Sequence, residues 1–104
     1  MAAMPGFSTH LLDEALARKR REREELRRRV LTQAFVALDE LSQEIPFFEA
    51  YLFGSVVKPH KFREDSDVDV AILGLPDEYF FRAMAFLSAR LGRDVDLVQL
   101  EVCP

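Results

Sequence analysis

Three aspartates have the residue type and spacing of a metal-binding site. Asp67 and Asp69 open the apolar run "DVDVAIL", and Asp96 lies at the start of the similar run "VDLVQL". Successive side chains of a strand point to opposite faces, so Asp67 and Asp69 share one face, about 6.5 to 7 Å apart along the strand. If the run with Asp96 pairs beside theirs, a third carboxylate reaches the same patch. Clustered anions raise one another's pKa unless a cation neutralises them, and Mg²⁺ prefers such oxygen ligands.

A Gly-Ser pair precedes these acids. Gly54 permits unusual dihedral angles and a close approach of the backbone. Ser55 supplies a hydroxyl at what we expect to be the first turn of a short helix, where free N–H groups favour an anion. A phosphate-binding turn after one strand and a metal-binding acid pair at the start of the next predict a nucleoside triphosphate with Mg²⁺ as the ligand.

Helical periodicity dominates the first half of the chain. Residues 10–44 contain no Pro or Gly, and apolar residues recur there at spacings of three and four, which is typical of a helix with one buried stripe. The stripe thins for about two turns within "ARKRREREELRRR", so that either one helix projects into solvent or two helices meet there. Pro46 ends the pattern, because its ring cannot continue the hydrogen-bond ladder.

Strand patterns and one further helix make up the second half. "FFEAYLF" predicts a strand, "GS" a turn, "DVDVAIL" an internal strand and "DVDLVQLEV" a third strand. Between the last two, Asp77 is expected to cap a helix from about residue 78 to Leu91, which Gly92 closes. We expect its buried residues to include Phe81, Ala85, Leu87 and Leu91.

These elements predict an α+β fold. Its small mixed sheet carries the long N-terminal helix and the second helix on one side. Residues 1–9 are expected to form a loose tail in which Ser8 or Thr9 caps the helix, residues 10–45 a helical segment, and residues 46–104 the core that holds the aspartates.

Length and composition bound the class of protein. With 104 residues, of which 49% are hydrophobic, the chain forms one domain with a modest core, and a partner or oligomer is plausible from size alone. The single cysteine, Cys103, cannot form an internal disulfide, and no signal-peptide pattern opens the chain, so we expect a cytoplasmic protein. No apolar run approaches the roughly 18 residues of a membrane helix.

Charge divides the chain. Residues 1–29 hold eight Arg/Lys and five Asp/Glu, whereas residues 30–104 hold six and thirteen. The acidic part disfavours nucleic acid as a partner, although the Arg-rich segment alone has the charge to touch phosphate, a membrane surface or an acidic protein. Because Glu is interspersed at helical spacing, we expect a solvated face with many ion pairs instead.

Other chemically interesting residues have plainer explanations. Aromatic side chains in a strand usually belong to the core, so stacking on a base is the less favoured role for Phe47, Phe48, Tyr51 and Phe53. His60 is expected to be an exposed loop residue rather than a phosphate or base contact, and Glu64 and Asp65 are expected to be solvated.

The combination of motifs resembles a known family. "LFGSVVKPHKFREDSDVDVAIL", followed by a helix and "VDLVQL", is similar to the minimal nucleotidyltransferases of the DNA polymerase beta-like superfamily. The resemblance covers about residues 47–100. It implies that Gly54 and Ser55, with Lys58 beside them, bind the triphosphate, that Asp67 and Asp69 bind two Mg²⁺, and that Asp96 completes the catalytic triad.

The same resemblance implies an activity and a partner. The expected reaction is transfer of AMP from ATP to a hydroxyl. Minimal nucleotidyltransferases are commonly paired with HEPN-domain toxins, so the resemblance suggests an antitoxin that modifies a tyrosine of its toxin. A non-catalytic antitoxin that acts by occlusion and an enzyme that modifies a small molecule of the antibiotic type remain the alternatives.

Overall fold

Two helices and three strands follow one another along residues 9–101, the part of the chain that the computed structural model describes. The elements are, in order, α1 (Thr9–Glu44), β1 (Glu49–Phe53), the 3₁₀ helix η1 (Gly54–Val57), β2 (Val68–Leu73), the 3₁₀ helix η2 (Asp77–Tyr79), α2 (Phe80–Leu91) and β3 (Val95–Leu100). Thr9 already belongs to α1. The rest of the expected tail, with Ser8, and Cys103 lie outside the described residues.

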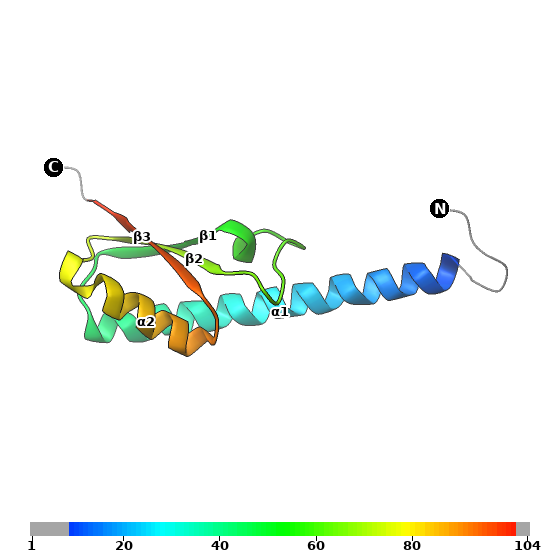
Figure 1. The fold of residues 1–104 in the computed structure, drawn as a ribbon, viewed down its shortest axis with the longest axis horizontal. Coiled ribbons are helices and arrows are strands. Elements are labelled where there is room, and N and C mark those ends of the chain that lie inside the picture. The colour runs from blue at the N-terminus through cyan, green and yellow to red at the C-terminus, as the bar shows by residue number, and fades with distance from the viewer. Residues whose placement is uncertain (1–8, 102–104) are drawn as a thin grey trace.

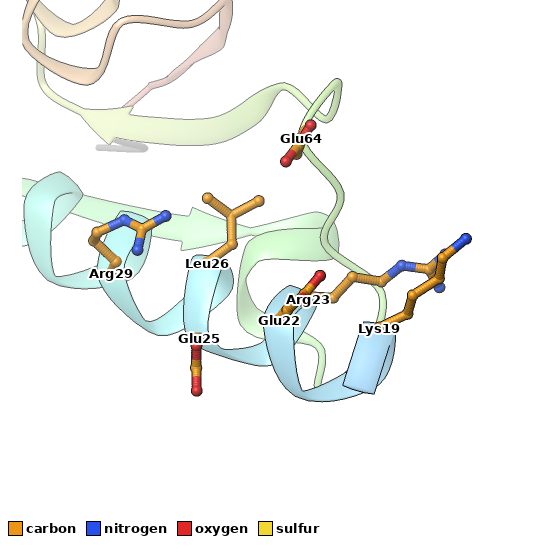
Figure 2. A pocket seen from close by; sticks show the side chains of 7 residues that line it. All are labelled: Lys19, Glu22, Arg23, Glu25, Leu26, Arg29 and Glu64. Atoms are coloured by element: carbon orange, nitrogen blue, oxygen red, sulfur yellow. The ribbon is translucent and has the colours of Figure 1, made fainter. Parts of the chain in front are cut away.

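The N-terminal helical segment is one helix of 36 residues, which settles the choice between one helix and two. Its C-terminal half packs on the rest of the fold, residues 45–101, which we call the body. Ile45 still donates a backbone hydrogen bond to Leu41 (2.9 Å) before Pro46 turns the chain. Residues 9–29 contain no buried residue and extend beyond the sheet (Figure 1). We call these residues the arm. Figure 2 shows where the arm leaves the body, below the loop that carries Glu64.

The sheet is mixed and has the order β1-β2-β3. Strands β1 and β2 are antiparallel, and β2 and β3 are parallel, with α2 making the crossover between them. Both helices lie on the same side of the sheet (Figure 1). The predicted α+β fold, with a small mixed sheet and two helices on one side, is therefore confirmed. The first strand begins at Glu49, two residues later than its aromatic run suggests.

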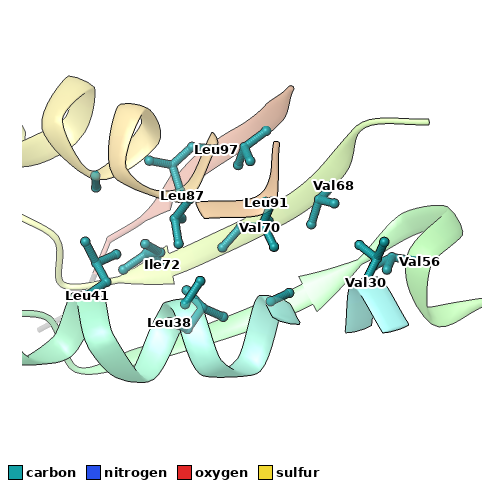
Figure 3. Close-up of a cluster of buried hydrophobic side chains, with 14 of the residues drawn as sticks. Val30, Leu38, Leu41, Val56, Val68, Val70, Ile72, Leu87, Leu91 and Leu97 are labelled. Atoms are coloured by element: carbon teal, nitrogen blue, oxygen red, sulfur yellow. The ribbon is translucent and has the colours of Figure 1, made fainter. Parts of the chain in front are cut away.

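The core lies between the sheet and the two helices (Figure 3). It forms because Val68, Val70 and Ile72 alternate along β2 and point toward the helices, where all three are buried. Complete burial of one such side chain contributes about 1.5–3 kcal/mol. Leucines from both helices and from β3 complete this cluster, namely Leu38, Leu41, Leu87, Leu91 and Leu97. The alternate residues of each strand point to the other side of the sheet, which we call the open face.

The aromatic residues of the first strand are placed differently from our expectation. Tyr51, Phe53 and Phe48 are exposed, whereas Phe47 packs against the core. The reason is strand alternation, since Ala50 and Leu52 occupy the positions of β1 that face the core. The prediction of a core role is therefore wrong for Phe48, Tyr51 and Phe53.

The start of the second helix also differs. Asp77 lies within η2 and makes no capping hydrogen bond; its Oδ1 accepts one from Gln99 Nε2 (3.0 Å) instead. Phe81 is 75% exposed and Ala85 is exposed, so their predicted burial is wrong. The buried face of α2 runs through Ala83, Leu87 and Leu91, at helical spacing of four.

Candidate functional site

The pairing of β2 with β3 brings two of the three aspartates together. Asp69 and Asp96 are direct partners in the parallel register, and Phe53 of β1 is the partner of Asp69 on the other side. The three residues therefore form one row across the open face. Asp67 lies immediately before β2, which begins at Val68. We call Asp67, Asp69 and Asp96 the acid triad.

Burial distinguishes Asp69 within the acid triad. Asp67 and Asp96 are exposed, whereas Asp69 is partly buried. Its pKa is raised above the usual range of an aspartate, first by burial and then by the negative charges of Asp96 and Asp67. The three carboxylates are thus close enough to repel one another, and a cation among them would relieve that repulsion.

The acid triad does not form a closed cation cage. Among residues 9–101, no three His, Cys, Asp or Glu side chains are gathered into a group that would hold a metal ion as it stands. The chemistry of the donors nevertheless fits a hard cation, since all three are carboxylates. Exposed side chains such as Asp67 and Asp96 can change rotamer at low cost, and Asp69 is the member that the fold holds in place.

Gly54 forms the wall against which Asp69 rests. Its φ is 75°, a left-handed conformation that glycine adopts without strain. A Cβ at this position would overlap with Asp69 Oδ2 and lie 3.0 Å from Asp69 Cγ. Both the backbone angle and the space therefore require glycine here, and the backbone of the Gly-Ser pair directly adjoins the central carboxylate.

Ser55 and Lys58 lie at the two ends of the turn that follows. The expected turn is the 3₁₀ helix η1, and the Lys58 backbone N–H donates to the Ser55 carbonyl (3.1 Å) at its end. Ser55 is partly buried and Lys58 is exposed. The structure thus brings Gly54 into contact with Asp69 and places Ser55 and Lys58 on the segment that leads away from this contact.

Arg93 holds the loop that leads to Asp67. Its Nη1 donates to the carbonyl oxygens of Glu64 (3.2 Å) and Ser66 (3.0 Å), and its guanidinium lies 4.8 Å from the ring centre of the buried Phe62. The backbone of Val68 is in turn bonded to Asp94 (3.1 Å). Arg93 therefore fixes the approach to the acid triad, a role that the sequence analysis missed because nothing local to Arg93 indicates a loop nearly thirty residues earlier.

A second pair that the sequence analysis missed joins α1 to η1. Arg27 Nε donates to both carboxylate oxygens of Glu24 (3.1 Å each), and Arg27 Nη1 donates to the Val56 carbonyl (3.2 Å). Glu24 also accepts a hydrogen bond from the His60 backbone (3.1 Å). The side chains of Glu24 and Arg27 are only 13% and 12% exposed. Their spacing of three residues is visible in the sequence, but many such pairs exist there, and only the tertiary structure shows which one is covered. His60 itself is exposed, as predicted.

We expect this pair to make stability depend on pH below neutrality. Hydrogen bonds from Arg27 and His60 lower the pKa of Glu24 to about 2 from the usual 4.5. A carboxyl whose pKa is lower in the folded state stabilises the fold above its unfolded pKa and loses that contribution as pH falls through the folded one. The Glu24→Gln variant should therefore melt several degrees lower than the parent at pH 7, and the difference should shrink between about pH 4.5 and 2.

The measurement is thermal unfolding by circular dichroism across this pH range. Glu25→Gln is the matched control, because Glu25 is the exposed neighbour in the same helix. It should melt close to the parent at pH 7. A Glu24→Gln difference that stays constant down to pH 2 would contradict the assignment.

The family comparison agrees with this site. The sequence profile described as "Polymerase beta, Nucleotidyltransferase" matches residues 39–104, more than half of the chain, and the chain belongs to this family. The match contains all members of the acid triad and the Gly-Ser pair. No curated protein and no solved structure matches the chain. Within the described residues, no helix is long and apolar enough to cross a membrane. The family gives nucleotidyl transfer as the general activity.

Proposed function

We propose that the chain binds ATP with Mg²⁺ and transfers AMP to a hydroxyl acceptor. In this reaction the acceptor oxygen forms a bond to the α-phosphorus, the bond from that phosphorus to the bridging oxygen breaks, pyrophosphate leaves, and the acceptor's proton is lost. Asp67, Asp69 and Asp96 are the catalytic residues and hold the metal. When bound, the metal neutralises the phosphate charge and lowers the pKa of the acceptor hydroxyl. In this proposal Asp96 takes the proton.

The contact between Gly54 and Asp69 carries this proposal. It brings Gly54 directly against a carboxylate whose negative charge is destabilised by burial and by two neighbouring aspartates. Because Gly54 has no side chain, the backbone at the start of the turn can be approached closely by a ligand. A triphosphate accompanied by a cation satisfies both features at once. Ser55 and Lys58 follow in the turn and provide a hydroxyl and a positive charge for the phosphates.

For the acceptor, we propose a tyrosine of a partner protein of the HEPN type, with the chain acting as its antitoxin in the cytoplasm. The resemblance to minimal nucleotidyltransferases supports this choice. The exposure of Asp67 and Asp96 also supports a macromolecular acceptor, because both helices lie on the other side of the sheet from Asp69 and Asp96.

Isothermal titration calorimetry tests the site before any acceptor is known. ATP should bind in the presence of Mg²⁺ with a Kd between about 1 μM and 1 mM, comparable to the usual range of KM values for enzyme substrates. Binding should be lost with EDTA, and AMP should bind far more weakly because it lacks the two outer phosphates. Equal binding of ATP with and without Mg²⁺, or none at all, would contradict the proposal. The acceptor is tested by transfer of α-labelled ATP to a HEPN-domain chain and by loss of the label when its tyrosine is replaced by phenylalanine.

A further inference from the structure

We propose that the arm, residues 9–29 of α1, is a docking helix for double-stranded DNA that lies in the major groove and contacts phosphates on both sides of it. This proposal goes beyond the nucleotidyl transfer described above and does not depend on it. The matched family region begins at residue 39, so the arm lies outside it.

An excess of positive charge without partners is the first observation. Residues 17–29 hold eight Arg/Lys and three Glu. Within the part of the chain that the structure describes, Glu24 makes the ion pairs of this segment, with Arg27, Arg28 and His60. The many ion pairs expected along this face are thus limited to Glu24. Six basic side chains of the segment take part in no ion pair of the described residues, namely Arg18, Lys19, Arg20, Arg21, Arg23 and Arg29.

The distribution of these charges around the helix is the second observation. At about 100° per residue, Arg18 and Arg29 lie on one side of the axis, Lys19 and Arg23 on a second, Arg20 on a third, and Arg21 and Arg28 on a fourth. A membrane or an acidic protein surface meets one side of a helix. The walls of a groove meet several sides at once. The acidic composition of residues 30–104 disfavours nucleic acid as a partner, whereas the distribution of positive charge around the arm favours it.

The shape of the molecule leaves residues 9–23 of the arm accessible on these sides, whereas Leu26 packs against the core and Arg27 is bonded to η1. The arm extends beyond the sheet (Figure 1). Where the arm leaves the body, an open hollow of about 540 Å³ is lined by Lys19, Arg23 and Arg29 together with Glu22, Glu25 and Glu64 (Figure 2). An α-helix with its side chains is about 10–12 Å wide. The major groove of B-form DNA is about 12 Å wide and admits it, whereas the major groove of duplex RNA is deep and narrow.

The acidic remainder of the chain restricts the contact to the arm. Residues 30–104 hold thirteen Asp/Glu against six Arg/Lys, so their net negative charge disfavours contact with the phosphate backbone of DNA. Charge also disfavours a dimer of this chain in which two arms pair with each other. Both arms carry the same positive charge on several sides, so they would repel each other.

Fluorescence anisotropy with a labelled 20-base-pair DNA duplex of mixed sequence tests the proposal on the full chain. We expect a Kd of about 1–100 μM near physiological salt. With five or six phosphates contacted, the affinity should fall about 10³-fold between 50 and 200 mM NaCl. A duplex RNA of the same length, poly-L-glutamate and phosphatidylserine vesicles should each bind at least 5-fold more weakly. Equal or tighter binding of any of these three probes would overturn the assignment to DNA, and so would salt-independent binding.

Three double substitutions to Gln separate groove binding from one-sided contact. Gln has a helix propensity close to that of Arg and Lys, so the arm should stay helical, which circular dichroism checks. Each pair removes two charges from a different side, and each should weaken DNA binding by a similar factor of about 5–20, consistent with two lost phosphate contacts. The pairs are Arg18 with Arg29, Lys19 with Arg23, and Arg21 with Arg28.

The matched control is Arg82→Gln on the exposed surface of α2, which should leave DNA binding unchanged. None of these variants should alter Mg²⁺-dependent ATP binding, so a failure here is distinguishable from a failure of the proposed function. If only one of the three double variants bound DNA more weakly than the parent, the proposal of groove binding would be overturned.

Discussion

The Asp69→Asn variant should transfer AMP about 10³-fold more slowly than the parent chain and bind ATP with little dependence on Mg²⁺. Asn retains the size of the side chain but removes its negative charge, and it replaces one acceptor oxygen by a donor. A metal ion contributes several kcal/mol of charge stabilisation in reactions of this kind, and about 4 kcal/mol corresponds to the expected factor. The measurements are calorimetry with ATP and transfer of labelled AMP.

The same variant should not be less stable, which distinguishes a lost site from a lost fold. The pKa of Asp69 is raised in the folded state, so folding disfavours its charged form. Above both the folded and the unfolded pKa, the ionised carboxylate therefore lowers stability, and a neutral Asn removes that effect. At pH 7 we expect the variant to melt at the same temperature as the parent or higher.

Two further aspartates provide the matched comparison. Asp96→Asn should also lose transfer, because Asp96 is the register partner of Asp69. Asp94→Asn should retain it to within about 3-fold, because Asp94 is exposed and is not a member of the acid triad. The backbone carbonyl of Asp94 accepts a hydrogen bond from the backbone N–H of Val68. This bond does not involve the Asp94 side chain, so the substitution should leave it in place. Equal losses in Asp94→Asn and Asp69→Asn would argue against the acid triad as the site.

The Gly54→Ala variant should lose transfer by about 100-fold or more while remaining folded. Its Cβ would overlap with Asp69 Oδ2, so the carboxylate must turn away from its present position. Misplacement of a reacting group by about 1 Å can cost a factor of this size. The left-handed φ of 75° adds a stability cost of about 1–2 kcal/mol for any residue with a Cβ.

Gly92 offers a control with the same backbone cost and no contact. Its φ is 63°, and a Cβ there meets nothing within 4 Å. Gly92→Ala should therefore lose about 1–2 kcal/mol in urea unfolding and keep normal ATP binding and transfer. If both glycine variants lost activity equally, the effect of Gly54→Ala would be one of general stability, and the role of the Gly54–Asp69 contact would be refuted.

A double-mutant cycle isolates the steric term. In an Asp69→Ala background the carboxylate is absent, so Gly54→Ala should cost only the backbone term in urea unfolding. The difference between its cost in the two backgrounds measures the contact itself. If Gly54→Ala cost the same free energy of unfolding in both backgrounds, the Asp69 side chain would accommodate the added Cβ without strain.

Much of the fold follows from patterns within single segments. The helical period and the absence of Pro and Gly specify α1 to within one residue at each end. Alternating and continuous apolar runs likewise specify β2 and β3 to within a residue or two, because the direction of successive side chains depends only on local geometry. The same rule separates the core side of β2 from the side that carries Asp69.

Errors arose where burial depends on neighbours far along the chain. Aromatic content suggested that Tyr51 and Phe53 are buried, but both helices cover the other face of the sheet. Phe81 was expected in the core because it is apolar, yet the buried stripe of α2 runs through Ala83 and Leu87. No property of either segment shows which of its sides meets another element.

The sequence by itself determined the elements, the order of the motifs and the family to which they point, since these depend on residue types at short spacing. Only the tertiary structure decided which groups meet. It placed Asp96 beside Asp69 through a parallel register, set Gly54 against the Asp69 carboxylate, and joined Glu24 and Arg93 to the segments that lead into the site. These contacts link residues about 15 to 36 positions apart, and their geometry follows from how strands and helices pack, which no local pattern encodes.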